Sequence, residues 1–283
     1  MSVDVEDYFH AHALSSSFPR AGWDDCECRV ERNINRVLQL FSDANIVATF
    51  FALGWIAERY PQVIRSIVAN GHELGSHGYD HTRADQQNPA EFRNDIRKTK
   101  QILEEVGCCP VFGYRAASFS IGSNNQWAFD ILEREGYKYS SSIYPISHDH
   151  YGSAKAPRFP FHPTRGALLE IPISTAQRLG YRIPCGGGGY FRLIPYAAFR
   201  ASLRRINYID RRPCVFYFHP WELDPFQPLA IGLTWRTRVR HYLNLSRMER
   251  RLSRLLSDFS WTRMDRIFLG LTDNVDTVTP VQS

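Results

Sequence analysis

Short apolar runs alternate with segments of helical periodicity along most of this chain, and that alternation limits the folds it can adopt. Ile46–Leu53 (IVATFFAL) is a continuous apolar run of strand length, which favours a strand buried on both faces. The preceding segment repeats apolar residues every three or four positions, which predicts an amphipathic helix over 30–41. Repeated units of this kind favour an α/β fold built on a parallel sheet.

The same two patterns recur further along the chain. The runs that predict other strands are Ser2–Val5, His72–His77, Val111–Ser118, Leu168–Ile173 and Cys214–Phe218. The segments that predict other helices are Trp55–Asn70, Pro89–Val106 and Asn125–Glu135. These elements fit either a barrel or a doubly wound sheet, and propensity alone does not choose between the two.

Two stretches interrupt the rhythm. Residues 145–167 are rich in Pro, His and Gly, which predicts a long surface loop. Residues 226–270 predict an amphipathic helix with a basic outer face, and we expect it to pack on the domain with that face in water. Contact of the basic face with a membrane or an acidic polymer is the alternative. The apolar stripe of this helix comprises Val239, Tyr242, Leu245, Met248, Leu252 and Leu255.

Composition excludes several classes of protein. With 43% apolar and 22% charged residues in 283, the chain is expected to be globular rather than disordered, collagen-like or a coiled coil. No run reaches the length of a membrane span, and the N-terminus lacks the basic and apolar regions of a secretory signal, which predicts a cytoplasmic protein. A net charge of +5 is weak support for nucleic-acid binding, so we expect none.

The first chemical signal is a pair of histidines in the sequence SHGYDH. His77 and His81 are four residues apart, so on a helical turn both imidazoles would reach one metal ion. The pair follows a predicted strand and includes Gly78, a position at which α/β enzymes commonly hold their sites. A metal site with an open position is therefore expected here.

A carboxylate ligand is available at the end of the first predicted strand. Asp4 and Glu6 are two residues apart, so in a strand they point to the same face. Two buried carboxylates are costly unless a cation or a proton lies between them. Asp7 is expected in a solvated acidic turn.

Three further features could contribute to a site. His219 ends the buried run CVFYF, where a histidine is well placed for acid–base chemistry. Arg115 ends another predicted strand and could pair with a carboxylate. Four consecutive glycines after Cys185 would let a ligand approach the backbone closely.

The order of these motifs, an acidic DxE, then HGYDH, GYRAAS and FHPWE, resembles the polysaccharide deacetylases of the NodB type (carbohydrate esterase family 4). The resemblance spans about residues 1–225 and implies a distorted (β/α) barrel with seven strands, followed by a small helical appendage over 226–283. Three segments are similar to those of a subgroup encoded at exopolysaccharide loci linked to PEP-CTERM systems: VDVEDYFH, TFFALGW and GGGGYFRLIPY. The chain would thus take part in exopolysaccharide synthesis, in the cytoplasm or at the inner membrane face through the basic helix at 236–255.

The resemblance also implies a role for each matching residue. The implied activity is metal-dependent removal of N-acetyl groups from an amino-sugar glycan, with Zn²⁺ as the expected ion and a backbone N–H near Ala116 helping to hold the oxyanion. The implied catalytic residues are Asp4 as base, Arg115 as the residue that orients it, and His219 as acid. The implied metal ligands are Glu6, His77 and His81, with Asp7 as a substitute for Glu6. The aromatic residues expected to bind the sugar are Tyr8, Tyr114, Tyr190 and Trp221.

This chain departs from the family pattern at three places. Asp4-x-Glu6 replaces two adjacent aspartates, Ala117 replaces a proline, and Ser140 stands where the subgroup tends to have an aspartate. If that aspartate tunes the acid histidine, activity would be reduced, and a catalytically impaired carbohydrate-binding protein is one alternative. The other is a hydrolase of small cyclic amides or imides on the same fold, which a narrow closed pocket would favour.

Overall fold

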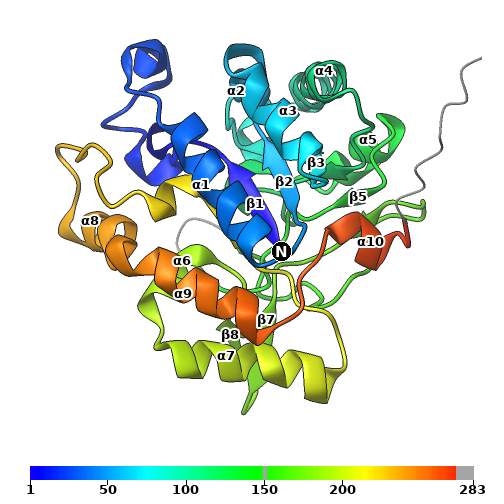
Figure 1. The fold of residues 1–283 in the computed structure, drawn as a ribbon. Coiled ribbons are helices and arrows are strands. Elements are labelled where there is room, and N and C mark those ends of the chain that lie inside the picture. Colours follow the sequence, from blue (N-terminus) through cyan, green and yellow to red (C-terminus); the bar gives the residue numbers. More distant parts are fainter. Residues whose placement is uncertain (149–151, 272–283) are drawn as a thin grey trace, which may run out of the picture.

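The computed structural model describes residues 1–148 and 152–271 and has a seven-stranded parallel sheet at its centre (Figure 1). Its strands are β1 (Ser2–Val5), β2 (Thr49–Ala52), β3 (Glu73–Ser76), β4 (Gly113–Tyr114), β5 (Tyr139–Ser140), β6 (Leu169–Glu170) and β9 (Tyr217–Phe218). Their order across the sheet is β6-β5-β4-β3-β2-β1-β9, so the first and last strands of the chain lie side by side.

The sheet is curled into a half-barrel, which confirms the expected distorted (β/α) barrel (Figure 1). In β1, Val3 pairs with Phe50 of β2 on one side and with Phe218 of β9 on the other. Because all seven strands run parallel, their carboxyl ends meet at one edge. Residues that follow β1, β3, β4 and β9 are therefore brought together although they are distant in sequence.

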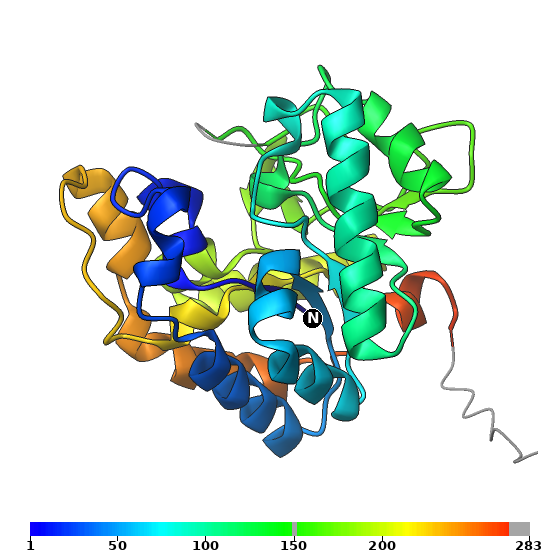
Figure 2. The ribbon, with the colours of Figure 1, turned by 90° about the horizontal axis from the view of Figure 1, so that it is seen from above.

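Five helices follow the early strands and cover the outside of the sheet (Figure 2). They are α1 (Val30–Asp43), α2 (Gly54–Arg59), α3 (Pro61–Ala69), α4 (Pro89–Gly107) and α5 (Trp127–Arg134). In α1 the predicted apolar stripe is buried, and the Phe41 ring lies edge-on to Phe50 of β2 and Phe218 of β9. The helix thus forms where its one apolar face meets the first strands of the sheet.

The single helix predicted over Trp55–Asn70 is wrong, because the chain breaks between α2 and α3. Tyr60 has φ −129° and ψ 56°, outside the helical region, and it precedes Pro61, the first residue of α3. A residue before proline is sterically disfavoured in the helical conformation. The proline therefore ends one helix and begins the next.

The predicted strands are present but mostly shorter than their apolar runs. The run over 111–118 contributes only Gly113–Tyr114, because the chain then enters a 3₁₀ turn at Ala117–Phe119 in which Ser118 and Phe119 have positive φ. The pattern did not reveal β5, the antiparallel hairpin of β7 (Thr175–Arg178) and β8 (Tyr181–Pro184), α6 (Gly188–Leu193) or α7 (Tyr196–Arg205). The missed strands and α6 have two to six residues each, too few for a periodicity to appear.

The predicted helix within 226–270 is divided into α8 (Trp235–Tyr242) and α9 (Leu245–Asp258), with α10 (Met264–Phe268) after them. Leu243 and Asn244 separate the first two, and Asn244 has a left-handed φ of 58°. The apolar stripe of α9 is buried and packs against the turn Pro220–Leu223, as expected, whereas Val239 of α8 is exposed. Residues 272–283 of the predicted 226–283 appendage lie outside the described residues, and the division at 225 stays a prediction.

No helix in residues 1–148 and 152–271 is long and apolar enough to cross a bilayer.

We expect Gly113→Ala to lower the free energy of unfolding by about 1–3 kcal/mol, the usual cost of overfilling a packed core. A Cβ at Gly113 would lie 2.3 Å from the hydroxyl of Tyr139, which is held by its hydrogen bond to Glu73. Gly22→Ala is the matched control, because no atom lies within 4 Å of its added Cβ. Urea unfolding checks this, and equal stability of the two variants would contradict it.

Candidate metal and catalytic site

The carboxyl edge of the sheet gathers the chemically active residues of four strands. Asp4 lies in β1 and Glu6 directly after it, His77 follows β3, Arg115 follows β4 and His219 follows β9. Asp4, Glu6, His77 and Arg115 are almost completely buried. The sequence motifs that seemed separate thus form one site.

Glu6, His77 and His81 form a group suited to hold a metal ion. One ligand atom from each lies within 4.8 Å of the other two. The Oε2 atom of Glu6 is buried and accepts no hydrogen bond from the described residues, although His81 Nε2 is 3.2 Å away. His77 Nδ1 lies 2.8 Å from the carbonyl oxygen of Arg115 and can donate to it, which leaves Nε2 as the free ligand atom.

The protonation of these groups also favours a cation. Burial raises the pKa of Glu6 to about 7, although the nearby His219 opposes that rise. Burial lowers the pKa of His77, and lowers that of His81 well below its ordinary value. Two neutral imidazoles facing a buried carboxyl with an unpaired oxygen are the donor set that a divalent ion such as Zn²⁺ would satisfy.

The helical turn expected for the two histidines is wrong. The segment from His77 to His81 is a loop in which Gly78 has φ +78° and His81 has φ +60°. The amide of Tyr79 donates to Asp95 Oδ1 at 2.7 Å, which fixes the loop against α4. The loop brings the two imidazole rings to 5.3 Å between centroids, so their proximity survives without a helix.

Asp7 does not lie in a solvated turn. Its carboxylate is fully buried and accepts hydrogen bonds from the backbone amides of Tyr8 and Arg29. It caps the short helical turn Tyr8–His10. Its oxygens are thus engaged by the backbone, whereas Glu6 is the carboxylate that faces the histidines.

Asp4 is held by a buried ion pair. Asp4 Oδ1 lies 2.6 Å from Nη1 of Arg115, which also donates to the hydroxyl of Ser2. The remaining guanidinium nitrogens donate to the carbonyl and hydroxyl of Ser141, and the group stacks over the Phe51 ring. Arg115 is therefore a fixed partner for Asp4 rather than a surface residue.

His219 lies between two carboxylates. Its Nε2 is 3.2 Å from Glu6 Oε1, and its Nδ1 is 2.9 Å from Glu222 Oε1. The Trp221 ring stacks on it at 5.0 Å and 11°. Burial opposes a charge on His219, but Glu6 and Glu222 outweigh it and raise the pKa to about 9.

Sequence analysis assigned no role to Glu222, which contacts Nδ1 of His219, or to Arg192, which pairs with Glu222. Arg192 Nε donates to Glu222 Oε2 at 2.7 Å, and both side chains are buried. Arg192 also donates to the carbonyls of His241 and Leu243, at the end of α8. Burial would raise the pKa of Glu222, but Arg192 and His219 lower it to about 2. The glutamate three residues after His219 in FHPWE was the available sequence signal.

The four glycines at 186–189 make close contacts within the protein rather than with a ligand. A Cβ at Gly188 would lie 2.2 Å from Glu222 Oε1, and one at Gly186 would lie 2.4 Å from Ile173. The close backbone approach expected from the sequence therefore occurs, but it is made to a carboxylate and to the core.

Ser140 is part of a separate hydroxyl network. Its Oγ donates to Ser142 Oγ at 2.8 Å, and Ser142 Oγ accepts the amide of Ala116. The amide of Ala116 is therefore engaged, and the oxyanion donor expected near Ala116 stays a prediction. The carboxylate at Nδ1 of His219 is that of Glu222.

The aromatic residues expected to bind sugar lie in different surroundings. Tyr8 and Tyr114 are each only 2% exposed; Tyr8 packs against Phe9, and Tyr114 against Phe92. Trp221 is also buried but stacks directly on His219, and Tyr190 is partly exposed. The structure thus brings Trp221 into contact with a residue of the site.

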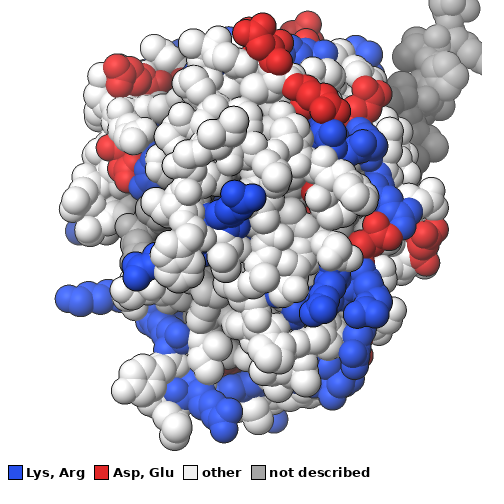
Figure 3. All heavy atoms as spheres, turned by 90° about the vertical axis from the view of Figure 1, so that its left-hand side faces the viewer, with Lys and Arg blue, Asp and Glu red and all other residues white. Residues whose placement is uncertain are grey.

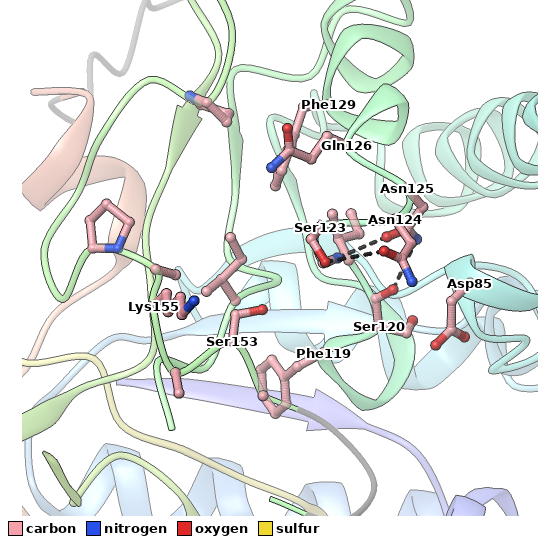
Figure 4. A pocket seen from close by; sticks show the side chains of 18 of the residues that line it. Asp85, Phe119, Ser120, Ser123, Asn124, Asn125, Gln126, Phe129, Ser153 and Lys155 are labelled. Atoms are coloured by element: carbon pink, nitrogen blue, oxygen red, sulfur yellow. Dashed lines mark hydrogen bonds between the residues drawn. The ribbon is translucent and has the colours of Figure 1, made fainter. Parts of the chain in front are cut away.

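A cavity of about 650 Å³ lies beyond Phe119 and is not lined by the metal-site or proton-transfer residues (Figure 4). Polar side chains line it, with Ser120, Ser123 and Asn124 on one side and Ser153 and Lys155 on the other (Figure 4). Its Phe119 ring lies 4.9 Å from the ring of Tyr217, which is in turn 5.6 Å from that of His219. Sequence analysis did not identify this cavity, because its walls come from loops distant in sequence.

Two family models match consecutive parts of the chain. Residues 22–140 match "Polysaccharide deacetylase", and residues 141–269 match a "Domain of unknown function (DUF3473)". The chain therefore contains a polysaccharide deacetylase domain. The site draws on a wider span: Asp4 and Glu6 precede the first match, whereas His219, Glu222 and Arg192 lie within the second.

Curated relatives are similar over part of their length. A peptidoglycan-N-acetylglucosamine deacetylase of Bacillus cereus is 38% identical over 78 residues, which cover 27% of this chain and 28% of that protein. The deacetylase PgdA of Listeria monocytogenes is 35% identical over 157 residues, which cover 51% of this chain and 33% of that protein. The matches thus span about a third of each relative.

Among solved structures, that of a candidate polysaccharide deacetylase from Mycobacterium smegmatis shares the fold with a TM-score of 0.60. The match covers 94% of this chain and 87% of that one, at 19% sequence identity.

We expect chelator-stripped protein to bind about one Zn²⁺ per chain, because three ligands with an open position suit this ion. Glu6→Gln and the double variant His77→Ala/His81→Ala should bind at least about a hundredfold more weakly. Isothermal titration measures this, with His162→Ala, an exposed histidine, as the control. Unchanged affinity in the double variant would contradict the site.

We also expect Glu170→Gln to change how stability depends on pH. Burial raises the pKa of Glu170 from 4.5 to about 7. Between these values the folded state keeps a proton that the unfolded state has lost, so the free energy of unfolding falls as pH rises. Glutamine cannot ionise, so the free energy of unfolding of Glu170→Gln relative to the parent should increase across this window by about 3 kcal/mol.

Urea unfolding at pH 4.5 and pH 8 tests this expectation. Glu105→Gln, at an exposed position of α4, is the control. An advantage of Glu170→Gln that is the same at both pH values would contradict the assigned pKa.

Proposed function

We propose that this chain, which contains a polysaccharide deacetylase domain, is a metal-dependent hydrolase that removes N-acetyl groups from an amino-sugar glycan. The observation that carries the proposal is the single site in which Glu6, His77 and His81 adjoin Asp4 and His219. The names of the two bacterial relatives support N-acetylglucosamine as the sugar. A role in exopolysaccharide synthesis, with cytoplasmic localisation, remains part of the proposal.

The reaction consumes water, breaks the amide C–N bond and releases acetate and a free sugar amine. An ion held by Glu6, His77 and His81 would polarise the acetyl carbonyl and make water a better nucleophile. Asp4, fixed by Arg115, accepts the proton of the attacking water. His219, whose pKa Glu6 and Glu222 raise, would donate a proton to the departing amine.

Glu222 positions the acid in this scheme. Its contact with Nδ1 of His219 fixes the ring so that Nε2 points toward Glu6 and the metal site. Arg192 in turn fixes Glu222. The subgroup tends to have an aspartate where this chain has Ser140. Here Glu222 provides a carboxylate to His219 instead, which argues against a catalytically impaired binding protein.

The size of the cavity beyond Phe119 supports a glycan over a small cyclic amide, if the glycan extends from the site into it. Its volume of about 650 Å³ is extended by a neighbouring hollow of about 500 Å³ that shares Arg83, Asp85 and Asn124 with it. Serine and asparagine side chains suit sugar hydroxyls and acetamido groups. A small ring would fill only a fraction of this space.

We expect Asp4→Asn and His219→Gln each to lower kcat by about 10²–10⁴-fold, since each removes a proton-transfer group. Release of free amine from an N-acetylglucosamine oligomer measures the rate in metal-loaded protein. The matched controls are Asp130→Asn and His162→Gln, both at exposed positions. Full activity in either site variant would contradict the proposed roles.

Glu222→Gln tests the positioning role in the same assay. It should lower kcat by at least about tenfold with KM little changed, and Glu222→Asp should restore part of the rate. A loss in both variants that follows their loss of folded protein would assign Glu222 to stability alone.

A further inference from the structure

Exposed apolar side chains gather on one short segment, residues 226–243. Ile231 is 89% exposed, Phe226 83% and Trp235 71%. The other large apolar residues exposed in this segment are Leu229, Val239 and Leu243. Nearly half of the large exposed apolar side chains of the described residues therefore lie in this one segment.

The orientation of α8 explains part of this exposure. Trp235, Val239 and Leu243 are four residues apart, so they follow one line along the outer side of the helix and its C-terminal cap. The inner side carries His241, which is buried, stacks on Trp221 and contacts Gln227. The stripe expected to pack inward is therefore divided, with Val239 facing outward and the stripe of α9 facing inward.

The exposed segment is held in a defined shape. The hydroxyl of Ser17 donates to the carbonyl of Ile231, and the amide of Ala230 donates to the hydroxyl of Tyr242. Thr234 caps α8 by accepting the amide of Thr237. The apolar side chains thus project from a segment whose backbone is held in place by hydrogen bonds.

The charges within this segment have one sign. Beside it, Arg29 donates to the carbonyl of Phe226 and pairs with the exposed Glu27. Residues 225–248 contain no Asp or Glu, but they contain four arginines at positions 236, 238, 240 and 247. Within the described part of the chain, neither Arg236 nor Arg238 forms an ion pair. Figure 3 views the molecule from the side on which α8 lies in Figure 1; basic atoms are scattered over the middle and lower parts of this face, and acidic atoms lie along its upper rim and side edges.

We propose that this docking surface, formed by Phe226, Leu229, Ile231, Trp235 and Val239 with Arg236 and Arg238, binds an anionic lipid bilayer. Aromatic and aliphatic side chains gain free energy by leaving water for the acyl boundary, and neighbouring arginines pair with lipid phosphates. The surface is separated from His219 by the stacked rings of Trp221 and His241.

Two other occupants fit the surface less well. An acidic polysaccharide would engage the arginines but would leave Leu229, Ile231 and Val239 in water. A second copy of the chain would bring like-charged arginines together across a two-fold contact. The inference does not depend on the proposed reaction.

Co-sedimentation of the full chain with vesicles tests the proposal. Vesicles of phosphatidylcholine with one part in three phosphatidylglycerol should bind the protein at least about tenfold better than phosphatidylcholine alone. Ile231→Ser/Trp235→Ser and Arg236→Gln/Arg238→Gln should each weaken this binding by about tenfold or more. Far-ultraviolet circular dichroism verifies that both double variants are folded.

The matched control is Arg65→Gln/Arg134→Gln, which removes the same charge from exposed positions on α3 and α5 and should bind as the parent does. An equal loss of vesicle binding in this control would show that binding depends on net charge alone, which would overturn the proposal. Binding of soluble polygalacturonate without binding of vesicles would also overturn it. So would a dimer in sedimentation equilibrium that Ile231→Ser/Trp235→Ser abolishes.

Discussion

The buried carboxylate of Glu6 is the feature on which the rest of the site depends. It is only 2% exposed and faces His81 through one oxygen and His219 through the other. A charge in such a place is unfavourable unless it is compensated by protons, hydrogen bonds or a cation. The loop that carries His77 and His81, and His219 directly after β9, supply the groups that face this carboxylate.

The site is assembled from both of the regions that match family models. Glu222 and Arg192 link His219 to the end of α8 through a chain of buried hydrogen bonds. Gly188 makes this possible, because any side chain there would occupy the place of the Glu222 carboxylate. The region of unknown function is therefore part of the site's construction, and its helices fix a residue that the proposed reaction needs.

Ser140 is a departure from the family pattern whose effect on activity stays a prediction. Read alone, the missing aspartate indicates a weakened acid histidine, but the structure places Glu222 at Nδ1 of His219 instead. Ser140 belongs to a network with Ser142 that holds the backbone after Arg115. A carboxylate therefore contacts His219 from another position in the sequence.

The sequence by itself determined the parallel α/β architecture and most of its longer elements, because an apolar run of strand length and a stripe of helical period are local properties. It also indicated Asp4, Glu6, His77, His81, Arg115 and His219, because their residue types and order match a known family. Only the tertiary structure decided that Asp7 caps a turn, that HGYDH is a loop, and that Glu222 and Arg192 support His219. The physical reason is that these outcomes depend on burial and on hydrogen bonds between segments up to about fifty residues apart, which no local pattern records.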